Sequence, residues 1–291
     1  MHRFLAVALL ASPALLAGTP VELAAARALF ENRQPVEAQQ AFERLAATDP
    51  RDPEVNYYLG QLANRRNEAD KAVPYFEAAV VAAPSVGRYH HGLGDAYGRK
   101  AQRAGIFSGL GLAKKCVAAY ERAVQLEPGN LDFRHSLFEY YRQAPGIAGG
   151  GFDKAVAQAA AMKQLDPLRG RVAFATLYAG EKKFQEAFAE FDDILRTDPD
   201  DFAALYQVGR LAALTGQSLE RGIAALRRCL ELPAPTTPKA PGHAAAYWRL
   251  GQLLEKKADS AGARTSYAAA VALDPKFTSA NEALTRLGAN E

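Results

Sequence analysis

Two pairs of side chains in the middle of the chain have the composition of a metal site or an acid–base pair. His91 is followed four residues later by Asp95, and His135 is followed four residues later by Glu139. A separation of four places both members of a pair on one face of a helix. Two imidazoles and two carboxylates would suit a divalent cation or a proton-transfer site if the two helices lay side by side. The alternative is two independent surface pairs, each held by a weak histidine–carboxylate contact.

The rest of the sequence offers no arrangement typical of catalysis. It contains no Gly-x-Ser-x-Gly nucleophile elbow and no His-Glu-x-x-His zinc string. The glycine-rich stretch after residue 105 lacks the Gly-Lys-Ser/Thr that ends a phosphate-binding loop. We therefore expect a protein that is not an enzyme and needs no cofactor, with the histidine–carboxylate groups as the one competing hypothesis.

Prolines recur at an interval that indicates a repeated unit. Pro50 and Pro84 are 34 residues apart, and the later intervals are 44, 39, 32 and 76. Proline disfavours helix in the residue before it, so each one marks the end of a helix. A unit of this length cannot bury its apolar face alone, and the units must stack. The prolines are Pro50, Pro84, Pro128, Pro167, Pro199 and Pro275.

Small and aromatic residues recur at fixed offsets from these prolines. Small residues let two helices approach closely, and a ring from the second helix fills the groove between them. The first half of a unit carries Leu59-Gly60, Leu93-Gly94, Val208-Gly209 and Leu250-Gly251. The second half carries an alanine at one offset (Ala38, Ala72, Ala155, Ala187, Ala263) and, at the offset four residues later, a ring (Phe42, Phe76, Tyr120, Phe191, Tyr267).

This pattern resembles the tetratricopeptide repeat family over about residues 21–287, as an exported bacterial member. The resemblance implies an all-α fold, a right-handed α-solenoid of stacked helix–turn–helix repeats forming a single domain over residues 19–291. Residues 278–287 are expected to form a C-terminal cap helix. The expected repeats lie near 19–52, 53–86, 87–130, 131–169, 168–201, 202–243 and 244–277.

The resemblance also implies a binding groove, because in this family the first helix of each unit lines the inner surface. Aromatic side chains flanked by polar ones suit such a groove, since they give contact area at a small cost in entropy. Ordinary helix surface is the alternative interpretation. The candidate binding residues are Tyr57, His91, Asp95, His135, Glu139, Arg142, Tyr206, Arg210 and Trp248.

Three insertions interrupt the repeat. Those near 99–112 and 143–152 are expected as neighbouring loops between the first and second helices of their units. The two loops would form a lobe containing Arg103, Ile106, Phe107 and Ile147, which either folds back on the solenoid or contacts a partner or a membrane surface. The third insertion, near 233–242, contains four prolines and is expected as an extended linker.

Charge and the N-terminal segment limit the partners and the compartment. The chain has 35 basic and 32 acidic residues, a balance that argues against nucleic acid as a partner. Residues 1–18 combine an early basic residue with an apolar run too short to span a bilayer, which predicts a cleavable signal peptide and a periplasmic or secreted protein. An apolar first helix of the solenoid is the alternative, and no transmembrane segment is expected elsewhere.

The two cysteines, Cys116 and Cys229, are expected as buried free thiols. They lie three units apart, or roughly 30 Å at helix-packing distances of about 10 Å per unit. A disulfide requires Cα atoms within about 7 Å of each other.

The sequence thus favours a non-catalytic protein–protein interaction scaffold of the cell envelope, with a protein or peptide partner in the concave groove. One alternative is a metal-dependent module built on the histidine–carboxylate groups. The other is an adaptor that contacts a membrane peripherally through the loop at 99–115.

Overall fold

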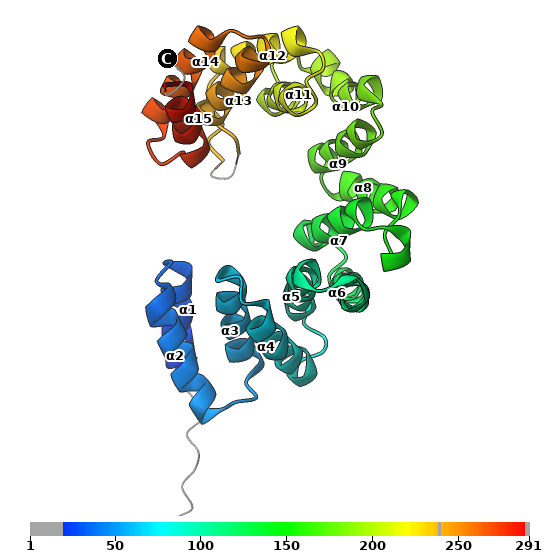
Figure 1. Ribbon diagram of the computed structural model, residues 1–291, viewed down its shortest axis with the longest axis vertical. Coiled ribbons are helices and arrows are strands. Elements are labelled where there is room, and N and C mark those ends of the chain that lie inside the picture. Colours follow the sequence, from blue (N-terminus) through cyan, green and yellow to red (C-terminus); the bar gives the residue numbers. More distant parts are fainter. Residues whose placement is uncertain (1–19, 238–239, 289–291) are drawn as a thin grey trace, which may run out of the picture. The chain divides into compact units, whose positions relative to one another are not determined.

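The computed structural model describes residues 20–237 and 240–288, and every regular element in these ranges is helical (Figure 1). The side chains of residues 106 and 107 and the expected signal peptide, residues 1–18, lie outside the described part. The chain forms two compact units, Met1–Gly151 and Phe152–Glu291, which we call unit 1 and unit 2. The single continuous solenoid expected from the repeat therefore stays a prediction.

Unit 1 contains three complete helix pairs and the first helix of a fourth. Each helix packs on the next one along the chain, as stacked repeats require. The elements are α1 (Pro20–Glu31), α2 (Pro35–Thr48), α3 (Pro53–Arg65), α4 (Ala69–Ala82), α5 (Gly87–Arg103), α6 (Ile106–Leu126), α7 (Leu131–Gln143) and the short 3-10 helix η1 (Gly146–Ala148).

Unit 2 continues the same alternation and ends in a single helix, α15, which packs on α14 where a cap helix is expected. The elements are α8 (Phe152–Leu165), α9 (Pro167–Gly180), α10 (Phe184–Thr197), α11 (Phe202–Thr215), α12 (Leu219–Glu231), α13 (His243–Lys256), α14 (Ser260–Leu273) and α15 (Thr278–Gly288). The boundaries of these pairs agree with the expected repeats.

The glycines of the first helices are required by rings of the second helices. A Cβ atom on Gly60 of α3 would lie 2.9 Å from the Phe76 ring of α4. A Cβ on Gly94 of α5 would lie 2.6 Å from the Tyr120 ring of α6. The ring fills the space that the glycine leaves, so the spacing of these residues sets the distance between the paired helices.

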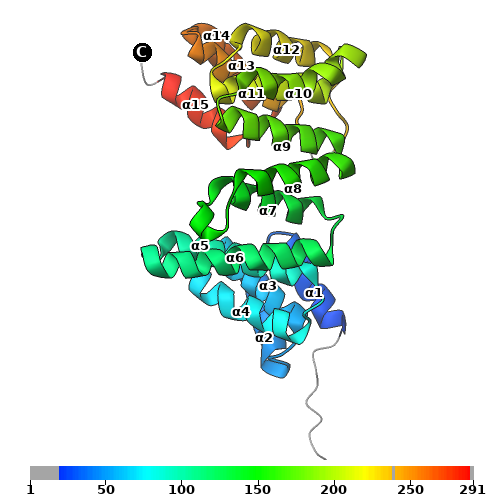
Figure 2. The same cartoon turned by 90° about the vertical axis from the view of Figure 1, so that its right-hand side faces the viewer.

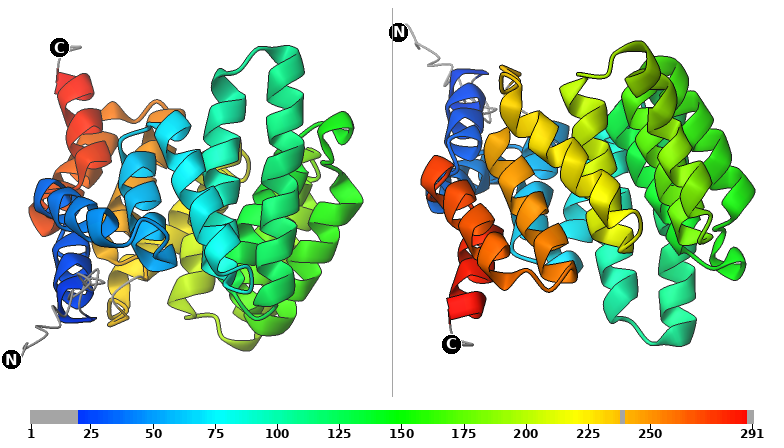
Figure 3. Two further views of the ribbon diagram at one scale, coloured as in Figure 1. Left: turned by 90° about the horizontal axis from the view of Figure 1, so that it is seen from below. Right: turned by 90° about the horizontal axis from the view of Figure 1, so that it is seen from above.

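The expected loop at 99–112 is wrong, because these residues extend two helices. α5 has 17 residues and α6 has 21, against 13 and 14 in the pair α3 and α4. Only Ala104 and Gly105 form the turn. The stretch from Arg99 to Arg103 contains only Arg, Lys, Ala and Gln, all strong helix formers, so the helix continues. We call this long pair the α5–α6 hairpin; its end projects beyond the other helices of unit 1 (Figures 2 and 3).

The connection between α7 and α8 is irregular, as expected, and part of it folds back on unit 1. The Tyr140 hydroxyl lies 2.7 Å from the carbonyl oxygens of both Ala113 and Ala148, and its single proton is donated to one or the other. Ala148 is buried, whereas Ile147 is 70% exposed. Gly150 has no room for a Cβ, which would lie 1.8 Å from the Ala144 oxygen. The third insertion joins α12 to α13 without regular structure in its described residues.

Candidate functional site

A half-open pocket lies between α5, α6 and α7, and we call it the α5–α7 pocket. Its volume is about 480 Å³. Small residues of α5 and α6 form its floor, and polar side chains of α7 border it. The lining residues are Gly98, Ala101, Gln102, Ala113, Cys116, Tyr120, His135, Ser136, Glu139, Tyr140, Gln143 and Ala144.

Of the two predicted histidine–carboxylate pairs, His135 and Glu139 line this pocket, whereas His91 and Asp95 contact residues that line it. His91 of α5 contacts Ser136 of α7, with 2.8 Å between Nε2 and Oγ. Its Nδ1 lies 3.8 Å from the Asp95 carboxylate, and its ring stacks on Phe133 at 4.8 Å. Asp95 also accepts a hydrogen bond from the Tyr120 hydroxyl at 2.7 Å. His91 and Asp95 therefore hold two lining residues of the pocket, Ser136 and Tyr120, in place.

His135 and Glu139 lie on the border of the pocket itself. The His135 side chain is exposed and lies beside the Phe138 ring. Glu139 accepts hydrogen bonds from Arg142 and Gln143, each at 2.6 Å. Burial alone would raise the pKa of Glu139, but these two hydrogen bonds and the Arg142 charge outweigh it and lower the pKa. The carboxylate is therefore ionised and held in place at neutral pH.

The metal hypothesis for His91, Asp95, His135 and Glu139 is not supported by the geometry. In residues 20–237 and 240–288, no group of three or more His, Cys, Asp or Glu side chains could hold a metal ion. Three of the four groups are engaged by other partners: His91 by Ser136, Asp95 by Tyr120, and Glu139 by Arg142 and Gln143. The contacts of His91 and Asp95 therefore differ from those of Glu139.

Cys116 forms part of the pocket floor as an inert thiol. It is a free cysteine and 2% exposed, and Cys229 of unit 2 is likewise free and buried, as expected. Burial, aided by the nearby Asp95 carboxylate, raises the pKa of Cys116 to about 12. Burial also raises the pKa of Tyr140 to about 12. The floor therefore stays uncharged and offers no thiolate nucleophile.

A second cleft, in unit 2, is formed mainly by α13 and α15; we call it the α13–α15 cleft. Its volume is about 610 Å³, and Trp248, Gln252, Lys256 and Glu282 line it. The Trp248 ring packs on Phe277 at 5.3 Å, and the Arg249 guanidinium lies 4.1 Å from its centre. The predicted tryptophan is therefore fixed from two sides while still facing a cleft.

Glu255 organises one end of this cleft. It accepts a hydrogen bond from the Tyr267 hydroxyl at 2.5 Å and two from Arg286, both at 2.8 Å. The two-point contact with Arg286 joins α13 to the cap helix α15. Glu255 and Arg286 are engaged with each other. The remaining polar groups of the cleft, such as Lys256 and Glu282, are therefore the ones placed to contact a ligand.

The other predicted binding residues differ in accessibility. Tyr57 is half-buried between the rings of Phe76 and Tyr89, and the Arg88 guanidinium lies 5.2 Å from its centre. Tyr206 is 7% exposed and belongs to the hydrophobic core of unit 2.

Tyr206 was expected in the groove, and that interpretation is wrong. Its ring packs among the core residues of unit 2 and offers almost no surface. Arg142 is exposed beside Glu139, and Arg210 is half-exposed and donates to Gln207 at 3.3 Å. The lobe residues Arg103 and Ile147 lie at the end of α5 and in η1, and the side chains of Ile106 and Phe107 are outside the described part.

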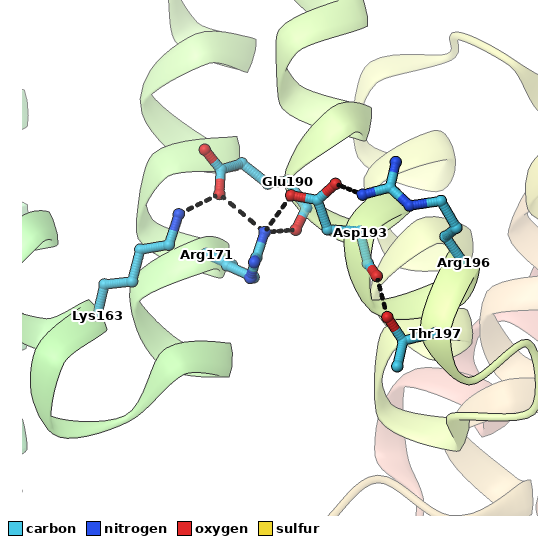
Figure 4. A network of polar contacts seen from close by, with 6 residues as sticks. All are labelled: Lys163, Arg171, Glu190, Asp193, Arg196 and Thr197. Carbon is cyan, nitrogen blue, oxygen red and sulfur yellow. Dashed lines mark hydrogen bonds and ion pairs between the residues drawn. The ribbon is translucent and has the colours of Figure 1, made fainter.

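The structure also contains a polar network in unit 2 that sequence reasoning missed (Figure 4). Lys163 of α8 pairs with Glu190 of α10 at 3.0 Å. Arg171 of α9 donates to the Glu190 carbonyl at 2.8 Å and lies 3.8 Å from the Asp193 carboxylate. The partners are 19 to 27 residues apart in sequence, so no local spacing signals them.

The described elements define a class of protein, an all-helical stack of helix pairs with small-residue contacts. Two segments match models described as tetratricopeptide repeat, residues 23–86 and 244–277. The chain therefore contains tetratricopeptide repeats over residues 23–86 and 244–277. In the described residues no helix is long and apolar enough to cross a membrane.

Solved structures agree with this fold. A tetratricopeptide repeat protein from Parabacteroides merdae is 14% identical, with a TM-score of 0.60, and the match covers 92% of this chain and 97% of that one. Tom70 of yeast is 15% identical, with a TM-score of 0.62, over 89% of this chain and 52% of that one. These similarities concern the fold alone. A search of curated proteins gave no match.

Proposed function

We propose that this protein is a non-catalytic interaction scaffold that binds a protein or peptide partner at the α5–α7 pocket. Repeat solenoids commonly use extended surfaces of this kind for binding. The observation that carries the proposal is the pocket itself, whose border contains His135 and Glu139, two residues singled out by their positions in the repeat.

The chemistry of the pocket favours a side chain over a small charged ligand. Its floor combines alanines with the uncharged groups of Cys116, Tyr120 and Tyr140. Its border combines the carboxylate of Glu139 with the amides of Gln102 and Gln143. An apolar side chain of a partner would fill the floor, and the partner's backbone would find hydrogen-bonding groups at the border.

The α13–α15 cleft supports a second contact of the same type. A tryptophan held in place by neighbouring side chains suits an interaction hot spot, because little rotational freedom is lost on binding. Trp248 lies against Phe277 and Arg249, so its ring is preorganised. Trp248→Ala is expected to weaken partner binding about tenfold or more.

The test places a photo-crosslinking amino acid at Gln102, on the border of the α5–α7 pocket. Partner capture is then compared in two tryptophan variants of α6. Ala113→Trp fills the pocket floor, whereas Ala118→Trp adds the same volume at an exposed position of the same helix. We expect one specific partner to be captured by the parent and by Ala118→Trp, and to be lost in Ala113→Trp.

Circular dichroism of both variants controls for folding. Equal capture by the folded Ala113→Trp and Ala118→Trp variants would contradict the proposal, because the pocket would then play no part in binding.

We further propose that the protein is exported, with residues 1–18 removed. The support is the sequence alone: an early basic residue followed by an apolar run of signal-peptide length. Mass spectrometry of the protein from whole cells is expected to find an N-terminus near Thr19. An intact Met1 or His2 terminus would contradict export through a cleaved signal.

A further inference from the structure

The α5–α6 hairpin is longer than its neighbours, and its end overhangs unit 1. Lys100 of α5 pairs with Asp70, near the start of α4, at 2.8 Å. On the other side, α7 ends at Gln143, which lines the same pocket as Ala101 and Gln102. The residues after Gln102 therefore extend past both flanking helices, as the views from below and above show (Figure 3).

Basic side chains dominate this end of the hairpin. Residues 99–115 contain five basic residues and no acidic one. Lys100 is engaged by Asp70, and Lys115 lies 5.3 Å from the centre of the Tyr97 ring. The remaining three, Arg99, Arg103 and Lys114, are exposed on both helices of the hairpin. Asp70 is the one acidic residue that pairs with this group in the described part of unit 1.

Apolar and small residues occupy the tip between these charges. α6 begins at Ile106 and Phe107 and continues Ser-Gly-Leu-Gly-Leu. No acidic residue lies in the first turn of α6. An apolar end bordered by lysine and arginine is the arrangement of elements that lie in the interface of an anionic membrane, where the long basic side chains reach the lipid phosphates.

We propose that the end of the α5–α6 hairpin, residues 99–115, docks on a membrane surface that carries anionic phospholipids. The basic side chains of both helices supply the attraction, and the short apolar tip enters the headgroup region. The charge pattern selects anionic lipid over neutral lipid. The apolar tip favours a membrane over an acidic protein as the partner. Basic side chains alone would suffice to bind an acidic protein surface, whereas a membrane also accommodates apolar residues.

The test measures co-sedimentation of the protein from Thr19 onward with phosphatidylcholine vesicles. The vesicles contain about 30% phosphatidylglycerol, an anionic lipid content on the order of that in natural membranes. The variant Arg103→Gln/Lys114→Gln removes two charges of the hairpin end, one from each helix. We expect its binding to fall about 30-fold, from the contribution of two basic residues near an anionic surface. Binding of the parent should also weaken as salt rises, because the charges are exposed.

The matched control is Arg44→Gln/Arg122→Gln, which makes the same change in net charge at exposed positions of α2 and α6. We expect it to bind like the parent. Equal loss in both variants would overturn the proposal, because net charge and not the hairpin end would govern binding. Absence of binding to the anionic vesicles would overturn it as well, and retention on poly-glutamate would then indicate an acidic protein surface.

Insertion of the tip is read separately with an environment-sensitive dye. Ser108→Cys places a thiol at the exposed start of α6, and Ser85→Cys places one at the opposite end of α5. The native thiols are buried and their pKa values are raised to about 12, so the dye selects the new cysteine. We expect a blue shift on anionic vesicles only at position 108. A shift of the same size at position 85, or none at 108, would overturn the proposed orientation.

Discussion

The two units repeat the same helix pair but differ in the balance of polar contacts between their helices. In the described part of unit 1, three tyrosine hydroxyls donate to carboxylates of another helix, against one in the described part of unit 2, Tyr267 to Glu255. Ion pairs between elements occur in both units, as in Lys100–Asp70 of unit 1, and among the described residues they are more numerous in unit 2. The tyrosine pairs of unit 1 are Tyr97–Glu77, Tyr120–Asp95 and Tyr141–Glu121. The ion pairs of unit 2 include Lys163–Glu190, Arg171–Asp193, Arg228–Asp200 and Arg286–Glu255.

This difference shows that the repeat specifies packing but leaves the polar contacts free. The recurring spacing of small residues and rings is met in both units, at Gly60 with Phe76 and at Gly251 with Tyr267. The polar contacts follow whichever side chains lie beside that packing. Unit 1 is therefore expected to respond more strongly than unit 2 to alkaline pH, through its three tyrosines, and unit 2 more strongly to salt, through its more numerous ion pairs.

The largest expected effect comes from the shared packing. Phe76 is 0% exposed and fills the space against Gly60, so Phe76→Ala should lower the free energy of unfolding by about 3–5 kcal/mol. Hydrogen exchange should accelerate in α3 to α5. The control Val81→Ala removes an 82% exposed side chain of the same helix and should change stability by less than about 0.5 kcal/mol. Similar losses in the two variants would contradict this role of the ring.

The next effect concerns the ion network of unit 2. The Glu190 side chain is 14% exposed and serves both Lys163 and Arg171, so Glu190→Ala should cost about 2 kcal/mol. The exposed Glu186 of the same helix is the control, and its alanine variant should be near neutral. Denaturant unfolding in low and high salt should show the Glu190 effect shrinking as salt rises. A salt-independent loss would mean that packing, and not charge, is removed.

Unit 1 offers the corresponding test of its tyrosines. Tyr141→Phe removes the hydroxyl that donates to Glu121 at 2.6 Å and should cost about 1 kcal/mol at pH 7. The control is Tyr75→Phe in α4, a half-buried tyrosine whose loss of hydroxyl should be nearly silent. Equal destabilisation by both changes would contradict a specific role for the Tyr141–Glu121 bond.

The same tyrosine makes a pH prediction. Burial, then the hydrogen bond and charge of Glu121, raises the pKa of Tyr141 in the folded state above its ordinary value of 10.0. The stabilising contribution is therefore complete below pH 10 and is lost as the pH rises toward the folded-state pKa. Stability of the parent should fall more steeply above pH 10 than that of Tyr141→Phe, as measured by denaturant unfolding at each pH. Parallel curves would contradict the assignment.

The smallest expected effect concerns the buried cysteines, which should resist labelling equally in the two units. Burial raises the pKa values of Cys116 and Cys229 from 9.0 to about 12. A thiol reagent at pH 8 should label neither cysteine in the native protein and both in denaturant, as read by mass spectrometry. Rapid native labelling of one cysteine would show that its unit opens locally, and would rank the two units by stability.

The positions of some candidate residues followed from the sequence, and the errors in the others have a common physical cause. The repeat spacing placed His135, Glu139 and Trp248 on first helices, and each of them lines a pocket or cleft. The same spacing placed Tyr206 on the surface, although its ring is buried in the core. A residue's position on a helix gives the direction of its side chain, but the neighbouring helices decide whether that direction leads to solvent.

The sequence by itself determined the helix pairs, their boundaries and the close contacts between them, because these depend on local spacing: prolines that end helices, and glycines that admit rings. It also predicted that the two cysteines are buried free thiols, as the structure has them. Only the tertiary structure decided that the insertion at 99–112 lengthens a hairpin, that a pocket forms beside it, and which carboxylate each tyrosine or arginine meets. These outcomes depend on groups that are distant in the sequence, and no local pattern encodes which of them come together.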